Sequence, residues 1–348
     1  MKYQELMTKL TYARQCVSER EIVPLLSQIS FMKDKIVSFN GAQGIVVDYV
    51  SELECNVPGI PFYRFLETLD VEDIAIQVAD NNVVVKTKGA LAKFSQASTK
   101  DFERGILLPD IKDKTPIKVN KEFFEGLTNC LPTISNNIIL QNQSNVTLTN
   151  DGIFSTDNIR VSKFQTDLQV TPFKILLPKE FCKISIAIQK DLQTDGNMYI
   201  DGNLVIVTFP GITIYTKTVP CTEFLNYEKI IKETIGDSTE LVEKPIGLTQ
   251  ILDRCLVLLA NDLQKIVSVN VEAPFIEVKA SGKYGQYREQ VESKFREGYN
   301  INFKVDCQFF KDLLSCCDKI YFSKGKGNSI VIIGNEDKYT QLLLGSAE

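Results

Sequence analysis

The sequence contains no histidine, and this absence weakens every catalytic hypothesis at once. Histidine is the commonest general acid or base in enzymes and the commonest metal ligand in proteins. The chain also lacks a run of about eighteen apolar residues, which a membrane-spanning helix needs. Its first residues, MKYQELMTKL, have no apolar core of the kind found in signal peptides. We therefore expect a soluble, cytoplasmic protein that is not an enzyme and that needs no metal or cofactor.

Paired-cysteine motifs are absent as well. The 9 cysteines are scattered, odd in number and free of any CxxC spacing, which predicts reduced and mostly buried thiols. In such a protein the glycosylation motifs at Asn142 and Asn145 are chance matches. Cys316 and Cys317 are adjacent at the end of a predicted helix, where packing explains them better than redox chemistry.

An excess of positive charge is missing too. The net charge of -5 excludes a wholly basic nucleic-acid-binding surface, although a local basic strip on an acidic body stays possible. Any interaction with DNA must therefore depend on how the charges are distributed.

An internal repeat is the most informative feature that is present. Each copy runs through a short strand, an amphipathic helix, an alternating strand, a polar turn and two more strands. The copies begin at Ile60, Ile175 and Ile301, which are 115 and 126 residues apart, and their hairpin turns contain Asn82, Asp201-Gly202-Asn203 and Lys326-Gly327-Asn328.

A helix followed by strands precedes each copy. These helices are predicted over YQELMTKLTYARQCVS, KEFFEGLTNCL and LTQILDRCLVLLANDL. Two half-units of helix plus strands make one domain, so the chain is predicted to have three repeated domains over residues 1–114, 115–232 and 233–348. Six helices and about two dozen strands indicate an α+β fold with helices covering one side of antiparallel sheets.

Two charged, weakly periodic stretches separate the copies, at residues 100–118 and 228–245. They are typical of connectors between domains. The second, EKIIKETIGDSTELVEKP, leaves open whether it contains a short exposed helix.

Two segments that superficially resemble motifs for nucleotide or calcium binding lack the required spacing. The segment KGKGNS lacks the spacing of a phosphate-binding loop and falls in a predicted hairpin. Asp191, Asp195 and Asp201 are too loosely spaced for a calcium loop and lack its terminal glutamate.

Several segments resemble the bacterial DNA sliding clamps, the beta subunits of DNA polymerase III. EREIVPLLSQISFMKDKIVSF is similar to a first-domain stretch in which an arginine precedes a proline-containing turn, and GALAKFSQASTKDFER is similar to the segment that closes that domain. FSTDNIRVSKF resembles a second-domain signature with Thr-Asp-Gly-His-Arg-Leu, and KYTQLLLG resembles the C-terminal strand. The resemblance covers the whole chain in order.

The resemblance has clear departures. Asn158 and Ile159 stand where the family prefers Gly-His, Lys232 stands where a proline usually lies, and no Thr-Asp pair follows Asn40. These differences indicate a divergent clamp of the kind that a phage or plasmid would carry.

The resemblance implies a ring of two chains, joined head to tail, that encircles double-stranded DNA without sequence specificity and tethers a polymerase. Its inner surface would carry basic residues from the predicted helices and their flanks, and Arg20 matches the family's DNA-contacting arginine. The alternative is that these are ordinary solvated faces. The candidate DNA-binding residues are Lys9, Arg14, Arg20, Arg64, Lys121, Lys179, Lys183, Lys190, Arg254, Lys265 and Lys311.

The resemblance also implies a hydrophobic pocket between the second and third domains, which would bind short peptide motifs of the polymerase and the clamp loader. Its matched wall residues are Ile139, Thr156, Asn158, Ile159, Arg160, Val161, Leu342, Leu343 and Leu344. Two alternatives stay open: Leu342 to Leu344 could form a plain core strand, and Asp157 with Arg160 could form a turn closed by an ion pair. A competing hypothesis for the whole chain is a phage structural or interaction protein built from duplicated α+β modules.

Overall fold

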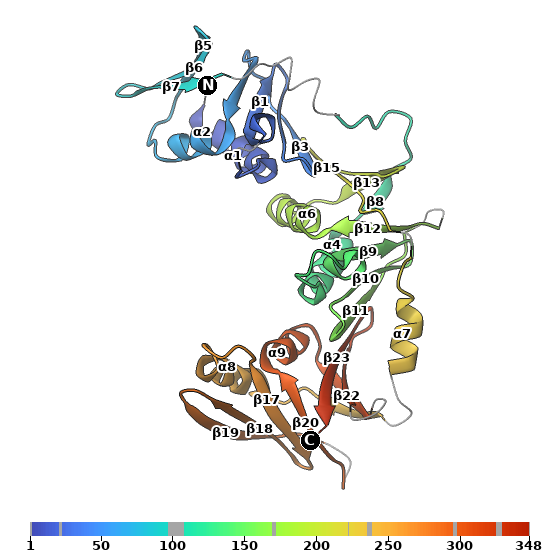
Figure 1. The fold of residues 1–348 in the computed structure, drawn as a ribbon. Coiled ribbons are helices and arrows are strands. Elements are labelled where there is room, and N and C mark those ends of the chain that lie inside the picture. The colour runs from blue at the N-terminus through green and yellow to red at the C-terminus, as the bar shows by residue number, and fades with distance from the viewer. Residues whose placement is uncertain are drawn as a thin grey trace. The chain divides into compact units, whose positions relative to one another are not determined.

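The computed structural model describes residues 2–20, 23–96, 108–168, 172–221, 223–234, 239–294, 298–324 and 329–347 (Figure 1). The chain divides into two compact units, each with two stretches of sequence. Unit 1 contains residues 1–124 and 180–220, and unit 2 contains residues 125–179 and 221–348. Each unit is described by itself below.

Unit 1 contains an eight-stranded antiparallel sheet and a separate three-stranded sheet. The strand orders are β4-β1-β2-β3-β15-β14-β13-β8 and β5-β6-β7. The elements are α1 (Tyr3–Ala13), η1 (Arg14–Cys16), η2 (Pro24–Ser27), β1 (Gln28–Met32), β2 (Lys35–Phe39), β3 (Gln43–Asp48), β4 (Cys55–Pro58), α2 (Gly59–Glu67), β5 (Ala75–Ala79), β6 (Asn82–Lys86), β7 (Leu91–Ser95), β8 (Ile117–Val119), α6 (Lys179–Leu192), β13 (Gly196–Asp201), β14 (Leu204–Phe209) and β15 (Ile212–Lys217).

Unit 2 contains a twelve-stranded antiparallel sheet. Its main path is β12-β9-β10-β11-β23-β20-β17-β18-β19, and β16, β21 and β22 branch from β23. The elements are α4 (Lys121–Cys130), which begins in unit 1, η3 (Leu131–Thr133), α5 (Gln141–Ser144), β9 (Asn145–Thr149), β10 (Gly152–Thr156), β11 (Arg160–Gln165), β12 (Lys174–Pro178), α7 (Tyr227–Thr234), β16 (Thr239–Glu243), α8 (Leu248–Leu258), β17 (Ile266–Glu272), β18 (Phe275–Gly282), β19 (Gly285–Glu292), β20 (Asn300–Asp306), α9 (Cys307–Cys316), β21 (Lys319–Lys324), β22 (Ser329–Asn335) and β23 (Tyr339–Ala347).

The threefold repeat predicted from the sequence is confirmed in the order of the elements. A strand, a helix and three strands recur as β4-α2-β5-β6-β7, β12-α6-β13-β14-β15 and β20-α9-β21-β22-β23. A helix and three strands precede each of them. One detail was wrong: the first copy's strand ends at Pro58, and Ile60 already lies in α2.

Two of the three predicted hairpins are present, but the first turn was predicted one residue too late, because Asn82 is already the first residue of β6. Asp80 and Asn81 join β5 to β6 with φ values of 49° and 59°, and Gly202 joins β13 to β14 with φ 59°. Such left-handed turns suit Gly, Asn and Asp, whose small or polar side chains tolerate positive φ. The third turn, at residues 326–328, lies outside the described residues, as do much of the first connector and part of the segment GALAKFSQASTKDFER.

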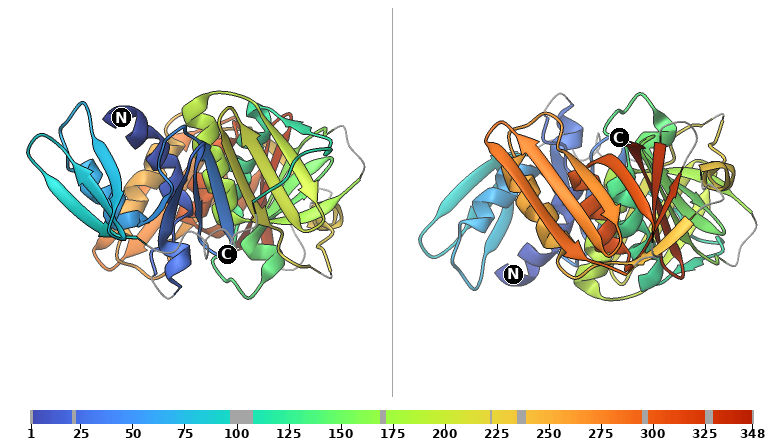
Figure 2. Two further views of the ribbon diagram at one scale, coloured as in Figure 1. Left: turned by 90° about the horizontal axis from the view of Figure 1, so that it is seen from above. Right: turned by 90° about the horizontal axis from the view of Figure 1, so that it is seen from below.

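Continuous sheets join one repeat to another. In unit 1, β15 of the second repeat pairs with β3 of the first, and Figure 2 shows these strands side by side. In unit 2, β23 of the third repeat pairs with β11 of the second. Through these pairings, each compact unit contains parts of different repeats. The predicted domain boundaries at residues 114 and 232 remain a prediction.

Amphipathic helices pack on antiparallel sheets, which confirms the α+β class, although in unit 2 helix α7 lies on the opposite face of the sheet from α9. In the third repeat, β20 alternates exposed and buried residues, so that Phe303 faces inward. Helix α9 buries Phe310 and Leu314 on one side, and the Phe310 ring lies 6.4 Å from that of Phe303. Seven of the cysteines are buried and Cys221 and Cys316 are partly buried, all as free thiols.

The second connector contains a helix, which was one of the two readings left open. Helix α7 is not fully exposed, because Tyr227 at its start is buried and Ile231 packs on the sheet of unit 2. Within the described residues, no helix has both the length and the apolar character required to span a membrane.

Candidate nucleic-acid interface and peptide groove

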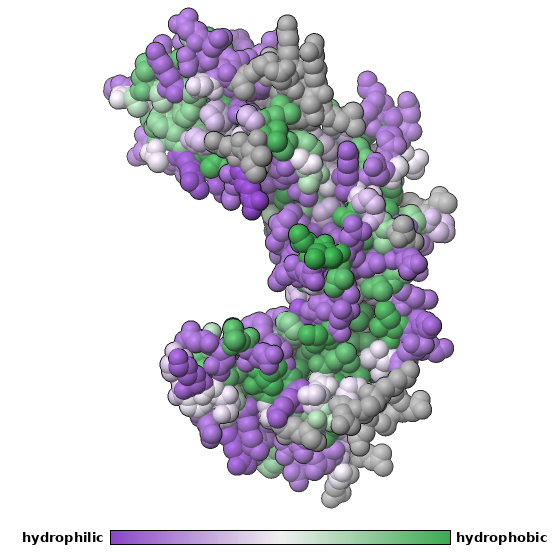
Figure 3. All heavy atoms as spheres, in the orientation of Figure 1, coloured by the Kyte–Doolittle hydropathy of each residue, from purple (hydrophilic) through white to green (hydrophobic). Residues whose placement is uncertain are grey.

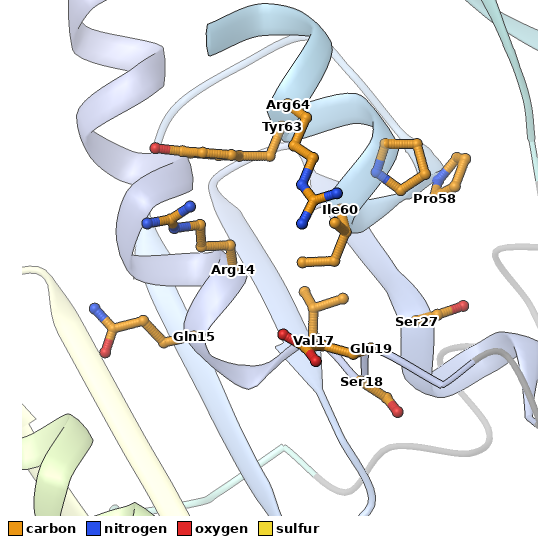
Figure 4. A pocket seen from close by; sticks show the side chains of 11 residues that line it. Arg14, Gln15, Val17, Ser18, Glu19, Ser27, Pro58, Ile60, Tyr63 and Arg64 are labelled. Carbon is orange, nitrogen blue, oxygen red and sulfur yellow. The ribbon is translucent and has the colours of Figure 1, made fainter. Parts of the chain in front are cut away.

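A pocket in unit 1 brings together two of the predicted DNA-binding arginines (Figure 4). Arg14 lies at the start of η1, directly after α1, and Arg64 lies in the last turn of α2. The pocket has a volume of about 680 Å³. It is lined by Arg14, Gln15, Val17, Ser18, Glu19, Ser27, Pro58, Ile60, Pro61, Tyr63 and Arg64.

Tyr63 holds one of these arginines in place. The Arg14 guanidinium carbon lies 4.3 Å from the centre of the Tyr63 ring, so the cation is stacked on the aromatic face. The Tyr63 hydroxyl is in turn 3.2 Å from Thr11 Oγ1 on α1. Both Arg14 and Arg64 are exposed, although Glu19 also lines the pocket and reduces its positive charge. Two exposed guanidinium groups on fixed helices can bind phosphate oxygens without contacting a base.

The remaining candidate DNA-binding residues are spread over both units, and none is buried. Several are already neutralised: Lys183 pairs with Glu180 at 2.7 Å, Arg254 with Glu289 at 2.7 Å and Lys311 with Asp253 at 2.5 Å. Lys179 donates to Asn136 Oδ1. Exposed ion pairs of this kind contribute about 0–1 kcal/mol, so a phosphate group could compete for these cations. The others are Lys9 on α1, Arg20 before η2, Lys121 on α4, Lys190 on α6 and Lys265 before β17.

The predicted peptide-pocket residues do not form one wall. Strands β11 and β23 pair so that Arg160 is opposite Leu343 and Val161 is opposite Leu342. Because side chains alternate along a strand, these two pairs point to opposite faces of the sheet. Leu343 is fully buried in the core of the third repeat, as the core-strand alternative had it. Val161 and Leu342 lie on the other face.

Arg160 is part of a buried ion-pair network and is only 4% exposed. Its guanidinium lies 2.9 Å from Asp157, 3.0 Å from Asp312 on α9 and 3.7 Å from the centre of the Phe309 ring, and it also donates to the carbonyl of Pro132. The alternative of a turn closed by an ion pair is therefore confirmed. This side chain joins the second repeat to the third.

The turn before Arg160 explains one departure from the clamp pattern. Asn158 has φ 74°, in the left-handed region where glycine is favoured and asparagine is the best-tolerated substitute. Asp157 Oδ1 accepts hydrogen bonds from the backbone of Ile159 and Arg160. Asparagine thus keeps the backbone shape that a glycine would give.

Exposed apolar residues lie close to the sheet face that carries Val161 and Leu342. Ile159 is 47% exposed and Leu344 is 37% exposed, and the Leu344 amide donates to the Ile159 carbonyl at 3.0 Å. Ile139 is 82% exposed and lines a separate recess of about 310 Å³ with Leu140 and Cys221. Hydrophobic patches are visible on the surface in Figure 3, among them one over the region of β11 and β23.

Comparison with solved structures identifies the fold. The chain superposes on a DNA polymerase sliding clamp from Bacillus subtilis with a TM-score of 0.86, at 15% identity over 100% of this chain and 98% of that one. A DNA polymerase III beta subunit from Pseudomonas aeruginosa gives 0.85 at 14% identity, over 100% and 99%. One from Thermotoga maritima gives 0.84 at 15% identity, over 100% and 98%. The chain has the sliding-clamp fold.

This clamp fold is evident from the structure and not from sequence similarity. No protein-family model matches the sequence, and no curated protein matches it either. The fold agrees with the resemblance found in the sequence and does not favour the alternative of a structural phage component.

Several residues that shape these sites could not be recognised from the sequence. Tyr63 lies in an amphipathic helix, where an aromatic residue usually indicates core. Val331, Ile333 and Ile231 form an apolar cluster with Leu342 and Val161, and their role depends on pairing between distant strands. Only the low polarity of KIYFSK and SIVIIG could have indicated that β21 and β22 have two covered faces.

Proposed function

We propose that this protein is a DNA sliding clamp, which encircles duplex DNA without sequence specificity and tethers a replicative polymerase as its processivity factor. The observation that carries the proposal is the match of the whole chain, at a TM-score of 0.86, to a protein described as a DNA polymerase sliding clamp. The proposed role is mechanical, and no catalysed reaction is assigned to the chain.

The chemistry of the arginine pocket suits this role. A ring stays on DNA by enclosing it, so its contacts with DNA have only to be weak and independent of sequence. Phosphate contacts have this character, because counterions and cations exchange readily along the backbone. Arg14 and Arg64 offer such contacts from fixed helices, whereas tight readout of bases would stop the ring from sliding.

We propose further that two chains close the ring head to tail. Strand β19 ends the sheet of unit 2, and β5 and β7 end the three-stranded sheet of unit 1. Unpaired strand edges promote association with other strands. Pairing the edge of one chain with that of the next would satisfy both, and a twofold arrangement would close the assembly.

The apolar face of β11 and β23 that carries Val161 and Leu342 would bind short peptides of the polymerase and the clamp loader. The partly exposed Leu344 and Ile159 offer apolar contacts near Val161, whereas Leu342 is buried beneath this face. Grooves that bind peptides are commonly apolar, with few polar anchors. Leu343 and Arg160 are left out of the proposed groove because both are buried on the opposite face.

Topological retention tests the proposal. The protein would be loaded on nicked circular DNA with a clamp loader, and retention would be measured by gel filtration before and after the circle is cut. We expect retention on the circle and loss after linearisation, because a ring slides off a free end. Equal retention on both forms would indicate surface binding and would contradict the proposal, as would a protein that forms no ring at any concentration, even with DNA and loader.

A further inference from the structure

A row of basic side chains crosses the sheet of unit 2 on the face opposite helices α8 and α9. The strand registers place Lys304 of β20 beside Ser268 of β17, Ser268 beside Lys279 of β18, and Lys279 beside Arg288 of β19. These strands are the orange arrows that lie side by side in the right-hand view of Figure 2. Because side chains alternate along a strand, the four residues share one face, while their neighbours along β17, β18 and β20 are buried in the core under the helices. We call these four residues the cation row.

The cation row lies in a recess of about 640 Å³. Of the described residues that line this recess, none is acidic. The side chains of Lys279 and Arg288 are 51% and 70% exposed, and Ser268, Ser281 and Gln286 add hydroxyl and amide groups to the lining. Lysine, arginine, serine and glutamine side chains are common donors to phosphate oxygens. The recess therefore offers an anion several donors at once.

Glu277 positions two of these cations. Its side chain is only 9% exposed and forms ion pairs with Lys279, at 2.6 Å, and with Arg288. The hydrogen bonds from Lys279 and Arg288 hold the pKa of the Glu277 carboxyl below its usual value. A lysine ammonium has three N–H donors and a guanidinium has five, so one carboxylate leaves donors on both cations for a ligand. With Lys304, three cations against one carboxylate leave a net charge of +2.

The positive strip is only one row wide. Adjacent strands are about 4.8 Å apart, so Lys304 and Arg288, which are three strands apart, are separated by about 14 Å across the sheet. On one side of the row, Glu277 lies two residues away along its strand, or about 7 Å, and Glu272 and Glu292 lie four residues away, or about 14 Å. These carboxylates share the face of the row because the separations are even.

We propose that the cation row binds the phosphate backbone of single-stranded nucleic acid. A strand stacked as in B-DNA carries one phosphate about every 3.4 Å, so about four phosphates fall over the length of the row. In a duplex the second backbone lies across a groove about 6 or 12 Å wide, which would bring it over the flanking carboxylates. A single strand avoids that repulsion.

The position of the row within the sheet favours a nucleic acid over an acidic peptide. Strands β20, β17 and β18 are each paired on both sides, so a peptide lying across them gains no main-chain hydrogen bonds from these strands. A phosphate backbone needs only cations and donors. A replicative polymerase works where single-stranded template meets duplex, so the proposed clamp would have such a strand close by. The inference goes beyond the clamp function and does not depend on ring closure.

Fluorescence polarisation with a labelled single-stranded oligothymidylate and the full-length chain, without a clamp loader, tests the proposal. The double variant Lys279→Glu/Arg288→Glu should bind about tenfold more weakly at low salt, and the slope of log K against log salt concentration should fall by about 1.4, or 0.7 per lost phosphate contact. Lys33→Glu/Lys88→Glu is the matched control, because it changes the charge equally at exposed positions of unit 1 and should bind as the wild type does.

Single substitutions that keep the ion pairs of Glu277 give a second measurement. Gln286→Glu should weaken binding several-fold and Gln286→Lys should tighten it, because they place opposite charges in the recess. Lys304→Glu should also weaken binding, and it lies on β20, away from the edge strand β19 that would take part in ring closure. If circular dichroism shows that the double variant is unfolded, these three variants decide.

Three results would overturn the proposal. The first is wild-type affinity in Lys304→Glu and in both Gln286 variants, and the second is equal weakening in the Lys33→Glu/Lys88→Glu control. The third is a polyglutamate peptide, or a duplex, whose binding depends on these residues as strongly as that of the single strand. If the wild type fails the circular-DNA test while these shifts appear, the clamp function is wrong and the single-strand site stands; the reverse pattern keeps the clamp and removes the site.

Discussion

Replacing Arg160 with alanine should destabilise unit 2 more than any exposed substitution would. The guanidinium is shared by Asp157 and Asp312, whose side chains are only 10% and 28% exposed. Its removal leaves two carboxylates without their cation and the Pro132 carbonyl without its donor. Breaking a buried ion pair in this way costs about 3–5 kcal/mol. The carbonyl and the lost Phe309 contact add to this, whereas solvent near Asp312 reduces it, so we expect about 3–5 kcal/mol in total.

Urea unfolding followed by circular dichroism measures this change, because the chain has no tryptophan to report by fluorescence. Arg160→Lys should give an intermediate loss, since lysine keeps the charge but lacks the planar fork that contacts both carboxylates. Arg288→Ala is a matched control, because its side chain is 70% exposed although it also pairs with a carboxylate. A loss of less than about 1 kcal/mol for Arg160→Ala would refute the reasoning from burial.

Two further predictions concern the arginine pocket and helix α7. The double variant Arg14→Glu/Arg64→Glu should weaken DNA binding at low salt, and the slope of log K against log salt concentration should fall by roughly 0.9 per lost phosphate contact. Lys33→Glu is the control, because the Lys33 side chain is 77% exposed and lies outside the pocket, and it should change neither the affinity nor the slope. An unaltered salt slope in the double variant would exclude the pocket from the DNA interface. Burial raises the pKa of Tyr227 from its ordinary value of 10.0 to about 12. The folded state therefore holds the phenol proton more tightly than the unfolded state does. This stabilisation is complete below about pH 10 and is lost as the pH rises through about 12. Tyr227→Phe should cost roughly 0.5–1.5 kcal/mol at neutral pH by urea unfolding, and the gap to the wild type should shrink over that alkaline range; a constant gap would show that the hydroxyl is not buried as described.

The repeated half-units could be predicted because their signals are local. Alternation of apolar residues along a strand and their helical spacing in α9 need only neighbouring sequence. The left-handed hairpin at Gly202 is likewise a property of a few residues. The ion pair between Asp157 and Arg160 was open to prediction for the same reason, since its partners are only three positions apart in the sequence.

Long-range pairing could not be predicted in this way. Nothing near Gly44 indicates that β3 pairs with β15, more than 160 residues further along the chain, because an edge strand and a central strand can have the same alternation. The pairing of β11 with β23 likewise decides that Val161 and Leu342 share a face and that Arg160 faces α9. The residues predicted to line the peptide pocket therefore include side chains from both faces of this sheet.

The departures from the clamp pattern separate into two physical kinds. Asparagine at position 158 keeps the left-handed backbone that glycine would provide, so the turn survives the change. Lysine at position 232 has the opposite effect, because a proline there would remove a helical hydrogen bond and clash with the preceding turn. Without that proline, residues 227–234 form a continuous helix that carries Ile231 to Leu342. Asn158 thus preserves the turn before Arg160, and Lys232 preserves the helical hydrogen bonds of α7.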